Sequence, residues 1–415
     1  AALVIVGVVE GLTSLVVIFF YFPPPSSSFG WFVENYENEM VYFSDLAKEG
    51  LRKHRYVCSD NSFLGFYVFE PFWNLSIKFV PKFIAPNVLT LSGGVCAAAV
   101  FSIIVSFAPS LDVRDSLPFW AAPVCVFLVA IYQTLDALDG KQARRYHAGS
   151  PLGEFLDHAT DSLVSGFLSI SCAAVLRTGA SFTSFLMVAL TMAVFHLATW
   201  AEYCSGVMNF SFTLDGAVEG PLFAMGVIIG PWIFSDSDFY THSVLGISLN
   251  HILVWIVYAP LSLIVIGLCL VRGIQSLPGH RKHTIAGALI RISGFALLLS
   301  SFVFLGVKQP ILLSEHPLVF LVTFCLSSSH LNWNLMLAHI SEVNHSPFSI
   351  IMFPLAVSAI NAVFQVVSPA FLLWAQFGFV CSAMIFMANE VVGEMSQILS
   401  VPIFFMPKKR SSRSD

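Results

Sequence analysis

The sequence predicts an all-α, polytopic helical membrane protein with about ten core transmembrane helices. Of its 415 residues, 56% are hydrophobic and 11% are charged. Apolar runs near the roughly 20 residues that a spanning helix needs recur along the chain. Seven of the eight cysteines lie in such runs and none has CxxC spacing, which predicts buried small side chains and neither a disulfide framework nor a zinc site. With a net charge of −5 and no basic face, the chain is not expected to bind nucleic acid.

The first 85 residues precede the core spans. Residues 1–22 are apolar apart from Glu10 and predict an extra transmembrane helix or an uncleaved anchor, because the run does not open with the basic residues of a cleaved signal peptide. Residues 1–42 therefore form an apolar segment and linker. Residues 43–85 predict a cytosolic or interfacial arm, with a helix from Glu70 to Lys82 in the membrane interface and Trp73 at headgroup level.

The core spans divide into two groups of five. The first five, in residues 86–235, carry the candidate functional residues, residues 236–405 form the C-terminal transmembrane helices, and residues 406–415 form a basic cytosolic tail. The ten predicted spans are 86–108, 117–138, 158–176, 181–204, 216–234, 249–271, 286–307, 316–339, 347–366 and 369–389.

The basic residues predict the orientation of the chain. They concentrate in the loops at 52–82, 141–145 and 272–282 and in the tail. With ten spans all of these fall on one side, which the positive-inside rule assigns to the cytosol.

Four aspartates stand where one predicted span ends and the next begins, in the segment DALDGKQARRYHAGSPLGEFLDHATD at 136–161. Asp136 and Asp139 are three residues apart and Asp157 and Asp161 four apart, so each pair shares a helix face. Gly153 lies on the face of Asp157, where a missing Cβ leaves room for a ligand. Acids next to apolar spans are costly unless they are paired or bind metal. The two facing pairs therefore predict a hard-cation site that holds two divalent ions, Mg²⁺ or Mn²⁺.

Neighbouring residues indicate that this site binds a phosphate-containing ligand. Arg144 can neutralise a phosphate oxygen, and Gly140 and Ala143 leave space for a nucleotide. Tyr132 lies four residues before Asp136 and predicts either packing against the nucleotide base or an ordinary interfacial tyrosine. A divalent-cation transporter is an alternative, although its acids would be expected near mid-bilayer on several helices.

The spacing Asp136-x2-Asp139-Gly140-x2-Ala143-Arg144-x8-Gly153-x3-Asp157-x3-Asp161 resembles the signature of the CDP-alcohol phosphotransferases at every fixed position. The flanks YQTLDALDGKQARR and SPLGEFLDHATDS resemble the eukaryotic choline/ethanolamine phosphotransferase branch. The resemblance covers roughly residues 50–400. It implies transfer of phosphocholine or phosphoethanolamine from CDP-choline or CDP-ethanolamine to diacylglycerol, with release of CMP.

The resemblance has further implications. Residues 86–235 would be the catalytic helices, Asn87 would contact cytidine or phosphate, and the enzyme would be a homodimer in the lipid bilayer of the endoplasmic reticulum or the Golgi. An acceptor of the inositol or glycerol phosphate type is the alternative within the family. Glu70 departs from the family pattern, which has a basic residue there.

The attacking alcohol needs a base, and His158 is the nearest titratable group that is not a predicted metal ligand. Glu154 lies four residues before His158 and could orient it or touch the nucleotide. Glu219 returns to the aspartate side at the start of the next span, which predicts a His158–Glu219 pair, a helix cap or a polar lipid contact. Weaker candidates nearby are Glu202, His196 and Asp215. His330 and His339 are expected to make hydrogen bonds between helices.

Overall fold

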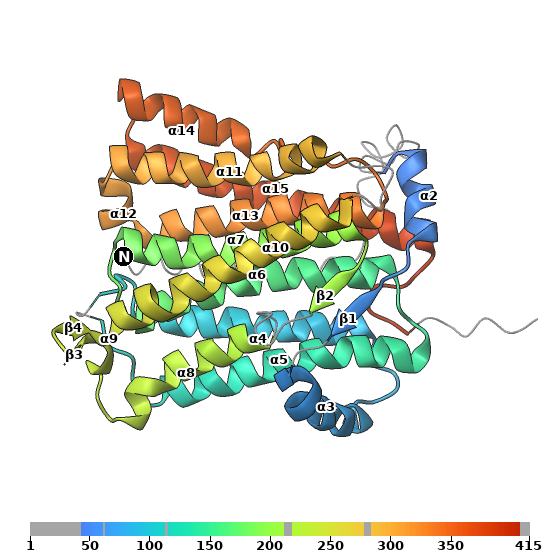
Figure 1. Cartoon of the computed structure of the whole chain (residues 1–415), viewed down its shortest axis with the longest axis horizontal. Helices are drawn as coiled ribbons and strands as arrows, with labels where there is room; N and C mark the ends of the chain where they lie inside the picture. Colours follow the sequence, from blue (N-terminus) through green and yellow to red (C-terminus); the bar gives the residue numbers. More distant parts are fainter. Residues whose placement is uncertain (1–42, 61–62, 113–114, 211–217, 278–283, 407–415) are drawn as a thin grey trace, which may run out of the picture.

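The computed structural model describes residues 43–60, 63–112, 115–210, 218–277 and 284–406, and the predicted N-terminal span, Asp215 and most of the basic tail lie outside them. The described chain is helical, with helices running side by side across the view of Figure 1. The all-α membrane fold is confirmed. A helical run lies at each of the ten predicted spans: α4 (Pro86–Phe107), α5 (Ala121–Tyr146), α6 (Pro151–Val175), α7 (Phe182–Ser205), α8 (Glu219–Ile233), α9–η4–α10 (Leu249–His251, Ile252–Tyr258, Ala259–Ser276), α11 (Ile285–Lys308), α13 (Pro317–Ile340), α14 (Met352–Phe364) and α15 (Pro369–Leu399).

Six of these runs in the described chain are long and apolar enough to cross a membrane: α4, α5, α7, α9–α10, α11 and α15. The helices α6 and α13 have 25 and 24 residues, but buried serines, histidines and asparagines lower their apolar content. These polar side chains face other helices rather than lipid. The helices α8 and α14 have 15 and 13 residues, which is short of the roughly 20 expected of a full span.

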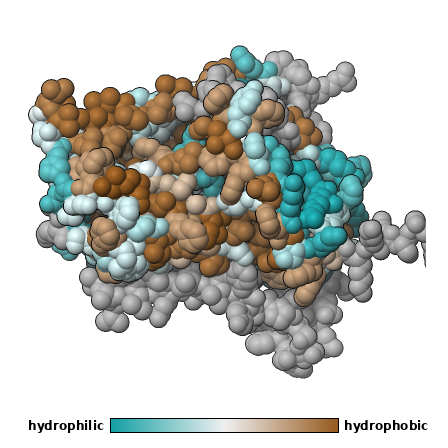
Figure 2. All heavy atoms as spheres, turned by 90° about the horizontal axis from the view of Figure 1, so that it is seen from below, coloured by the Kyte–Doolittle hydropathy of each residue, from teal (hydrophilic) through white to brown (hydrophobic). Residues whose placement is uncertain are grey.

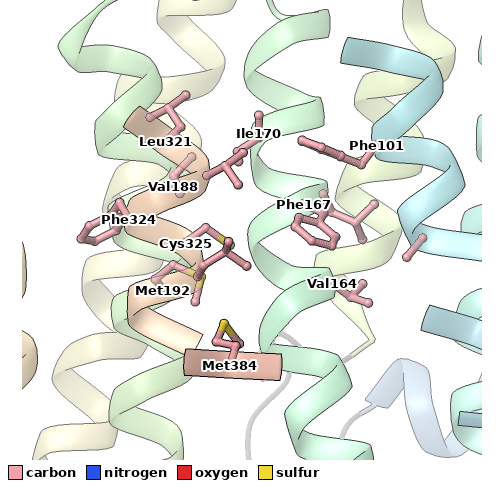
Figure 3. Close-up of a cluster of buried hydrophobic side chains, with 14 of the residues drawn as sticks. Phe101, Val164, Phe167, Ile170, Val188, Met192, Leu321, Phe324, Cys325 and Met384 are labelled. Carbon is pink, nitrogen blue, oxygen red and sulfur yellow. The ribbon is translucent and has the colours of Figure 1, made fainter. Parts of the chain in front are cut away.

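The core surrounds α6, which packs against α4, α7, α8 and α13. Figure 3 shows side chains of α4, α6, α7, α13 and α15 converging on one another. The rings of Phe101 and Phe167 stack at 4.9 Å. At Gly166 the backbone of α6 comes so close to α13 that an added Cβ would lie 1.9 Å from Cys325 Sγ. The close contact fixes α6 against α13, so the residues at its N-terminal end have a defined position.

The arm before α4 contains α2 (Asp45–Lys53), β1 (Cys58–Asp60), η1 (Gly65–Phe69), α3 (Glu70–Ser76) and η2 (Ile77–Phe79). Strand β1 pairs in parallel with β2 (Met208–Phe210), just after α7. The predicted helix in residues 70–82 is present in part, but the side chain of Trp73 is not exposed to the surroundings. It is buried with Leu89, Leu138 and Val218, because the large indole ring packs between the arm and the bundle.

The other end of the bundle carries shorter elements: η3 (Phe239–Thr241), a hairpin of β3 (Ser243–Val244) and β4 (Ile247–Ser248), and α12 (Ile311–Glu315). In Figure 2 hydrophobic residues cover much of the described surface between the two ends, and hydrophilic residues gather at the right-hand end, where Figure 1 places α2 and α3. This distribution is typical of a bundle whose flanks face lipid.

Replacement of Gly166 by alanine is expected to destabilise the bundle, because the new methyl group overlaps Cys325 in a well-packed core. Such overpacking typically costs about 1–3 kcal/mol. The thermal unfolding of the purified protein in detergent measures the effect. Gly378→Ala in α15 is the matched control, because a Cβ there meets nothing within 4 Å. Equal melting temperatures for the two variants would contradict the close α6–α13 contact.

Candidate functional site

The site is built at adjacent ends of α5 and α6, on either side of α4. Helix α5 ends where His147 adopts the left-handed conformation, with φ 52°. After a short connection, the Ser150 side chain accepts a hydrogen bond from the Gly153 amide and caps α6. Both helices extend further toward each other than the sequence predicts, so all four aspartates and the basic residues at 141–145 lie on helices rather than in a loop.

Three of the four aspartates converge. One oxygen of each of Asp136, Asp139 and Asp157 lies within 4.8 Å of the others. Asp161 interacts with Asp136 and accepts a 2.8 Å hydrogen bond from the hydroxyl of Tyr132. The residues that the sequence spacing placed on two helix faces therefore meet in one cluster.

Helix α4 supplies contacts to both aspartate helices. The hydroxyl of Thr90 donates a hydrogen bond to Asp139, and Gly94 lets Thr160 of α6 approach closely, since a Cβ on Gly94 would lie 2.8 Å from the Thr160 methyl group. Thr90 was not predicted as a site residue. Its position three residues after Asn87, on the same helix face, is the signal that could have found it.

The aspartate cluster fits a divalent metal ion in its chemistry. Its ligands are carboxylate oxygens only, which hard cations such as Mg²⁺ and Mn²⁺ prefer. Asp139 is 7% exposed and the other three are partly buried. Carboxylates packed this closely repel one another, and a bound cation removes that repulsion. Tyr132 and Thr90 each donate to one carboxylate and so restrict its orientation.

The glycines next to the cluster leave room for other side chains. A Cβ on Gly140 would lie 3.4 Å from Nη1 of Arg144, and a Cβ on Gly153 would lie 3.3 Å from Oδ1 of Asn87. The amide nitrogen of Asn87 donates to the carbonyl of Ile403 at 2.9 Å. Asn87 therefore lies across from Gly153, and its amide holds the C-terminal segment at this site.

The basic residues of α5 have separate roles. Arg145 donates to the carbonyl of Ile77 at 3.0 Å, and Lys141 pairs with Glu70 at 2.6 Å. Burial raises the pKa of Glu70, but the hydrogen bond and charge of Lys141 outweigh it, so the pKa lies below its ordinary value. Arg145 and Lys141 thus hold the arm. Arg144 is exposed near Ala143, and its side chain makes no hydrogen bond to another described residue.

His158 does not pair with Glu219 in the described structure. Its Nδ1 lies 3.8 Å from Oε2 of Glu202 instead, and the two oxygens of Glu219 are buried without a hydrogen-bond partner among the described residues. The start of α8 is held on the α5 side, because Gln133 donates to the carbonyl of Val218. The end of α7 brings Glu202, a weaker candidate in the sequence, to the α6 side.

The remaining candidates are also placed. Glu154 accepts a hydrogen bond from Nε2 of His54 in the arm at 2.9 Å. His196 contacts Asn332 at 2.6 Å, which links α7 to α13. His330 contacts Asn334 of its own helix and Ser349 in the segment between α13 and α14, so these hydrogen bonds do not join two helices as the sequence predicts. The contact between His54 and Glu154 spans 100 residues and has no signal in the sequence.

Comparison with known proteins identifies a family for one part of the chain. Residues 83–263 match the family model described as CDP-alcohol phosphatidyltransferase. Residues 83–263 therefore form a domain of the CDP-alcohol phosphatidyltransferase type. The domain contains α4 to α8 and therefore all four aspartates, His158 and Glu202, while His54 and His339 lie outside it.

Related proteins that align with all or only part of the chain agree with the assignment of this domain. An uncharacterized CDP-alcohol phosphatidyltransferase class-I family protein 2 of Dictyostelium discoideum is 27% identical over 379 residues, or 89% of this chain and 90% of that protein. Cholinephosphotransferase 1 of Rattus norvegicus is 37% identical over 169 residues, 39% of this chain and 40% of the relative. CDP-diacylglycerol–serine O-phosphatidyltransferase of Encephalitozoon cuniculi is 36% identical over 183 residues, which are 44% of this chain and 47% of the relative. The family is a class of transferases, and its members differ in head group and acceptor.

Proposed function

We propose that the chain transfers phosphocholine or phosphoethanolamine from a CDP-alcohol to diacylglycerol and releases CMP. The observation that carries the proposal is the convergence of Asp136, Asp139 and Asp157 within 4.8 Å, next to an exposed arginine. The similarity of part of the chain to cholinephosphotransferase 1 and the flanking sequence of the aspartates support the head group.

The residues act together on the diphosphate of the donor. The four aspartates would hold two divalent ions, Mg²⁺ or Mn²⁺, which when bound neutralise charge on the diphosphate and on the leaving CMP. Arg144 binds a further phosphate oxygen. Gly140, Ala143 and Gly153 leave room for the nucleotide, and Asn87 lies at the edge of this room, across from Gly153. Tyr132 positions Asp161 through its hydrogen bond, a role that differs from the predicted packing against the base.

The acceptor hydroxyl attacks the phosphorus of the phosphoalcohol. A new P–O bond forms to the acceptor, the P–O bond to CMP breaks, and the hydroxyl proton leaves. His158 takes this proton because it is adjacent to Asp157 but is not a member of the aspartate cluster. Oε2 of Glu202 lies 3.8 Å from Nδ1 of His158. Glu202 restrains the imidazole ring from this side.

An apolar groove supports a lipid substrate. It runs along α6 from Leu156 and Thr160, which neighbour Asp157 and Asp161. Its other lining residues, from α4, α6 and α13, are Leu91, Gly94, Ala159, Leu163, Val164, Phe167 and Trp333. A fatty acyl chain in this groove would place a glycerol hydroxyl near the aspartates. An apolar lining of this kind favours an acyl chain, whether that chain belongs to diacylglycerol as acceptor or to a CDP-diacylglycerol donor.

The second candidate function is therefore transfer from CDP-diacylglycerol to a small polar alcohol. The similarity to CDP-diacylglycerol–serine O-phosphatidyltransferase over 183 residues favours it, and inositol or glycerol phosphate are acceptors of the same type. A divalent-cation transporter is disfavoured, because the acids gather at one end of the bundle beside Arg144 rather than along several helices.

We further propose that the aspartate end faces the cytosol, in the endoplasmic reticulum or Golgi membrane, and that the enzyme is a homodimer. The basic residues of the arm and of the end of α5 lie at this end of the bundle, in agreement with the positive-inside rule. A water-soluble CDP-alcohol would reach the site from that side.

Purified protein in proteoliposomes with Mg²⁺ or Mn²⁺ is expected to form phospholipid and CMP from diacylglycerol with CDP-choline or CDP-ethanolamine. Asp157→Asn is expected to abolish turnover even at saturating metal, since Asp157 belongs to the converging cluster. Asp45→Asn, at an exposed position in α2, is the matched control. Product formed only from CDP-diacylglycerol with serine, inositol or glycerol phosphate would favour the second candidate. Metal flux into the proteoliposomes without CMP release would contradict the transferase function and favour a divalent-cation transporter.

His158→Ala is expected to lower kcat by about 10²–10⁴-fold with little change in the KM for the CDP-alcohol, because the base acts on the acceptor proton. Glu202→Gln should have a smaller effect that largely disappears in the His158→Ala background, since Glu202 acts through His158. Glu219→Gln, the residue that the sequence predicts as partner, should impair turnover less than His158→Ala. Wild-type turnover in His158→Ala would place the base elsewhere, with Asp161 as the first alternative.

A further inference from the structure

A second group of possible metal ligands lies beside the aspartates. The ligand atoms of His54, Glu154 and His339 all lie within 4.8 Å of one another, although the three residues come from the arm, α6 and α13. Nε2 of His54 is 2.9 Å from Oε2 of Glu154, and the two imidazole rings meet edge to face at 5.3 Å. The three side chains are 6–10% exposed.

A fourth group points into the same place. Oε1 of Glu202 in α7 lies 3.8 Å from Nε2 of His339, and the Glu202 side chain is 2% exposed. Its second oxygen, Oε2, faces His158 instead, at 3.8 Å from Nδ1, and has no hydrogen-bond partner among the described residues. In the described part of the chain, the ion-pair contacts of Glu154 and Glu202 are with histidines rather than with lysine or arginine. Two buried carboxylates thus share one location without a permanent positive charge.

We propose that His54, Glu154, Glu202 and His339 bind one Zn²⁺ ion at a site distinct from the aspartate cluster. Two neutral imidazoles and two carboxylates balance the charge of a divalent ion. Zinc is bound by histidine nitrogens and carboxylate oxygens at about 2.0–2.2 Å, which separates tetrahedral ligands by about 3.3 Å. The observed separations of 2.9 Å and 3.8 Å lie on either side of that value.

The ligand chemistry separates the two sites. The aspartate cluster has oxygen donors only, whereas this His₂Glu₂ group adds two imidazole nitrogens, which favour Zn²⁺ over Mg²⁺. A hydrogen bond between His54 and Glu154 accounts for one histidine. It does not account for the second imidazole, that of His339, within 4.8 Å of the same carboxylate, nor for the Glu202 carboxylate beside that imidazole. One metal ion bound by all four side chains would explain why they converge.

The ion would tie together four parts of the chain: the arm, α6, α7 and α13. It would also connect to the proposed chemistry, because the other oxygen of Glu202 lies 3.8 Å from His158. Only this last connection depends on the proposed function. The metal site itself stands on the four ligands and is tested without any turnover measurement.

The test uses the full chain in detergent, stripped with a chelator and then equilibrated with limiting Zn²⁺ in excess Mg²⁺. The expected result is one Zn²⁺ per chain by elemental analysis, with imidazole scattering in the zinc X-ray absorption spectrum. His339→Ala and Glu202→Gln should each weaken zinc retention by about tenfold or more, and zinc should raise the melting temperature of the wild type but not of these variants. His242→Ala, at an exposed histidine near the opposite end, is the matched control.

Three results would overturn the proposal. The wild type could retain no zinc, the variants could retain as much as the wild type, or the absorption spectrum could lack imidazole ligands. Glu202→Gln preserves the shape of the side chain and so guards against loss of zinc through misfolding. Asp157→Asn should keep its zinc, and loss of zinc there with retention in His339→Ala would assign the ion to the aspartates. Zinc retention does not depend on which CDP-alcohol or acceptor is used, so failure of the proposed function would leave this result unchanged.

Discussion

The main physical constraint on the structure is the mutual repulsion of the carboxylates that α5 and α6 bring together at one end of the bundle. Asp136, Asp139 and Asp157 converge within 4.8 Å, and no folding force favours such a cluster by itself. The surrounding structure opposes the repulsion. Thr90 and Tyr132 each donate to a carboxylate, and a close contact at Gly94 holds α4 against α6. A divalent cation would remove the repulsion, so this otherwise costly arrangement is consistent with the proposed metal-bound diphosphate.

The apolar core determines how well the carboxylates keep their positions. Helix α6 lies in the middle of the bundle, and the contact of Gly166 with Cys325 fixes it against α13. Side chains elsewhere on α6 face the apolar groove, the aspartate cluster and the group of His54, Glu154, Glu202 and His339. One helix therefore positions the proposed acceptor, the proposed metal ligands and the proposed base. The polar residues of α6 and α13 are tolerated at this depth because they face protein rather than lipid.

The sequence predicts those features that local spacing determines. The aspartates share helix faces at intervals of three and four, so their convergence follows once α5 and α6 are known to be neighbours. Long-range contacts could not be predicted in the same way. His158 meets Glu202 rather than Glu219, because the hydrogen bond from Gln133 holds the start of α8 on the α5 side. The sequence predicts Trp73 at headgroup level. Composition alone does not show that its ring packs between the arm and the bundle.

The most direct test of this account is the thermal stability of Asp136→Asn with and without Mn²⁺, because Asp136 interacts with both Asp157 and Asp161. Without metal, the variant should melt at a higher temperature than the wild type, since one of the repelling charges is removed. With saturating Mn²⁺ the order should reverse, because the wild type gains more binding free energy. A variant that is less stable than the wild type under both conditions would contradict the account, as would a wild type that Mn²⁺ does not stabilise.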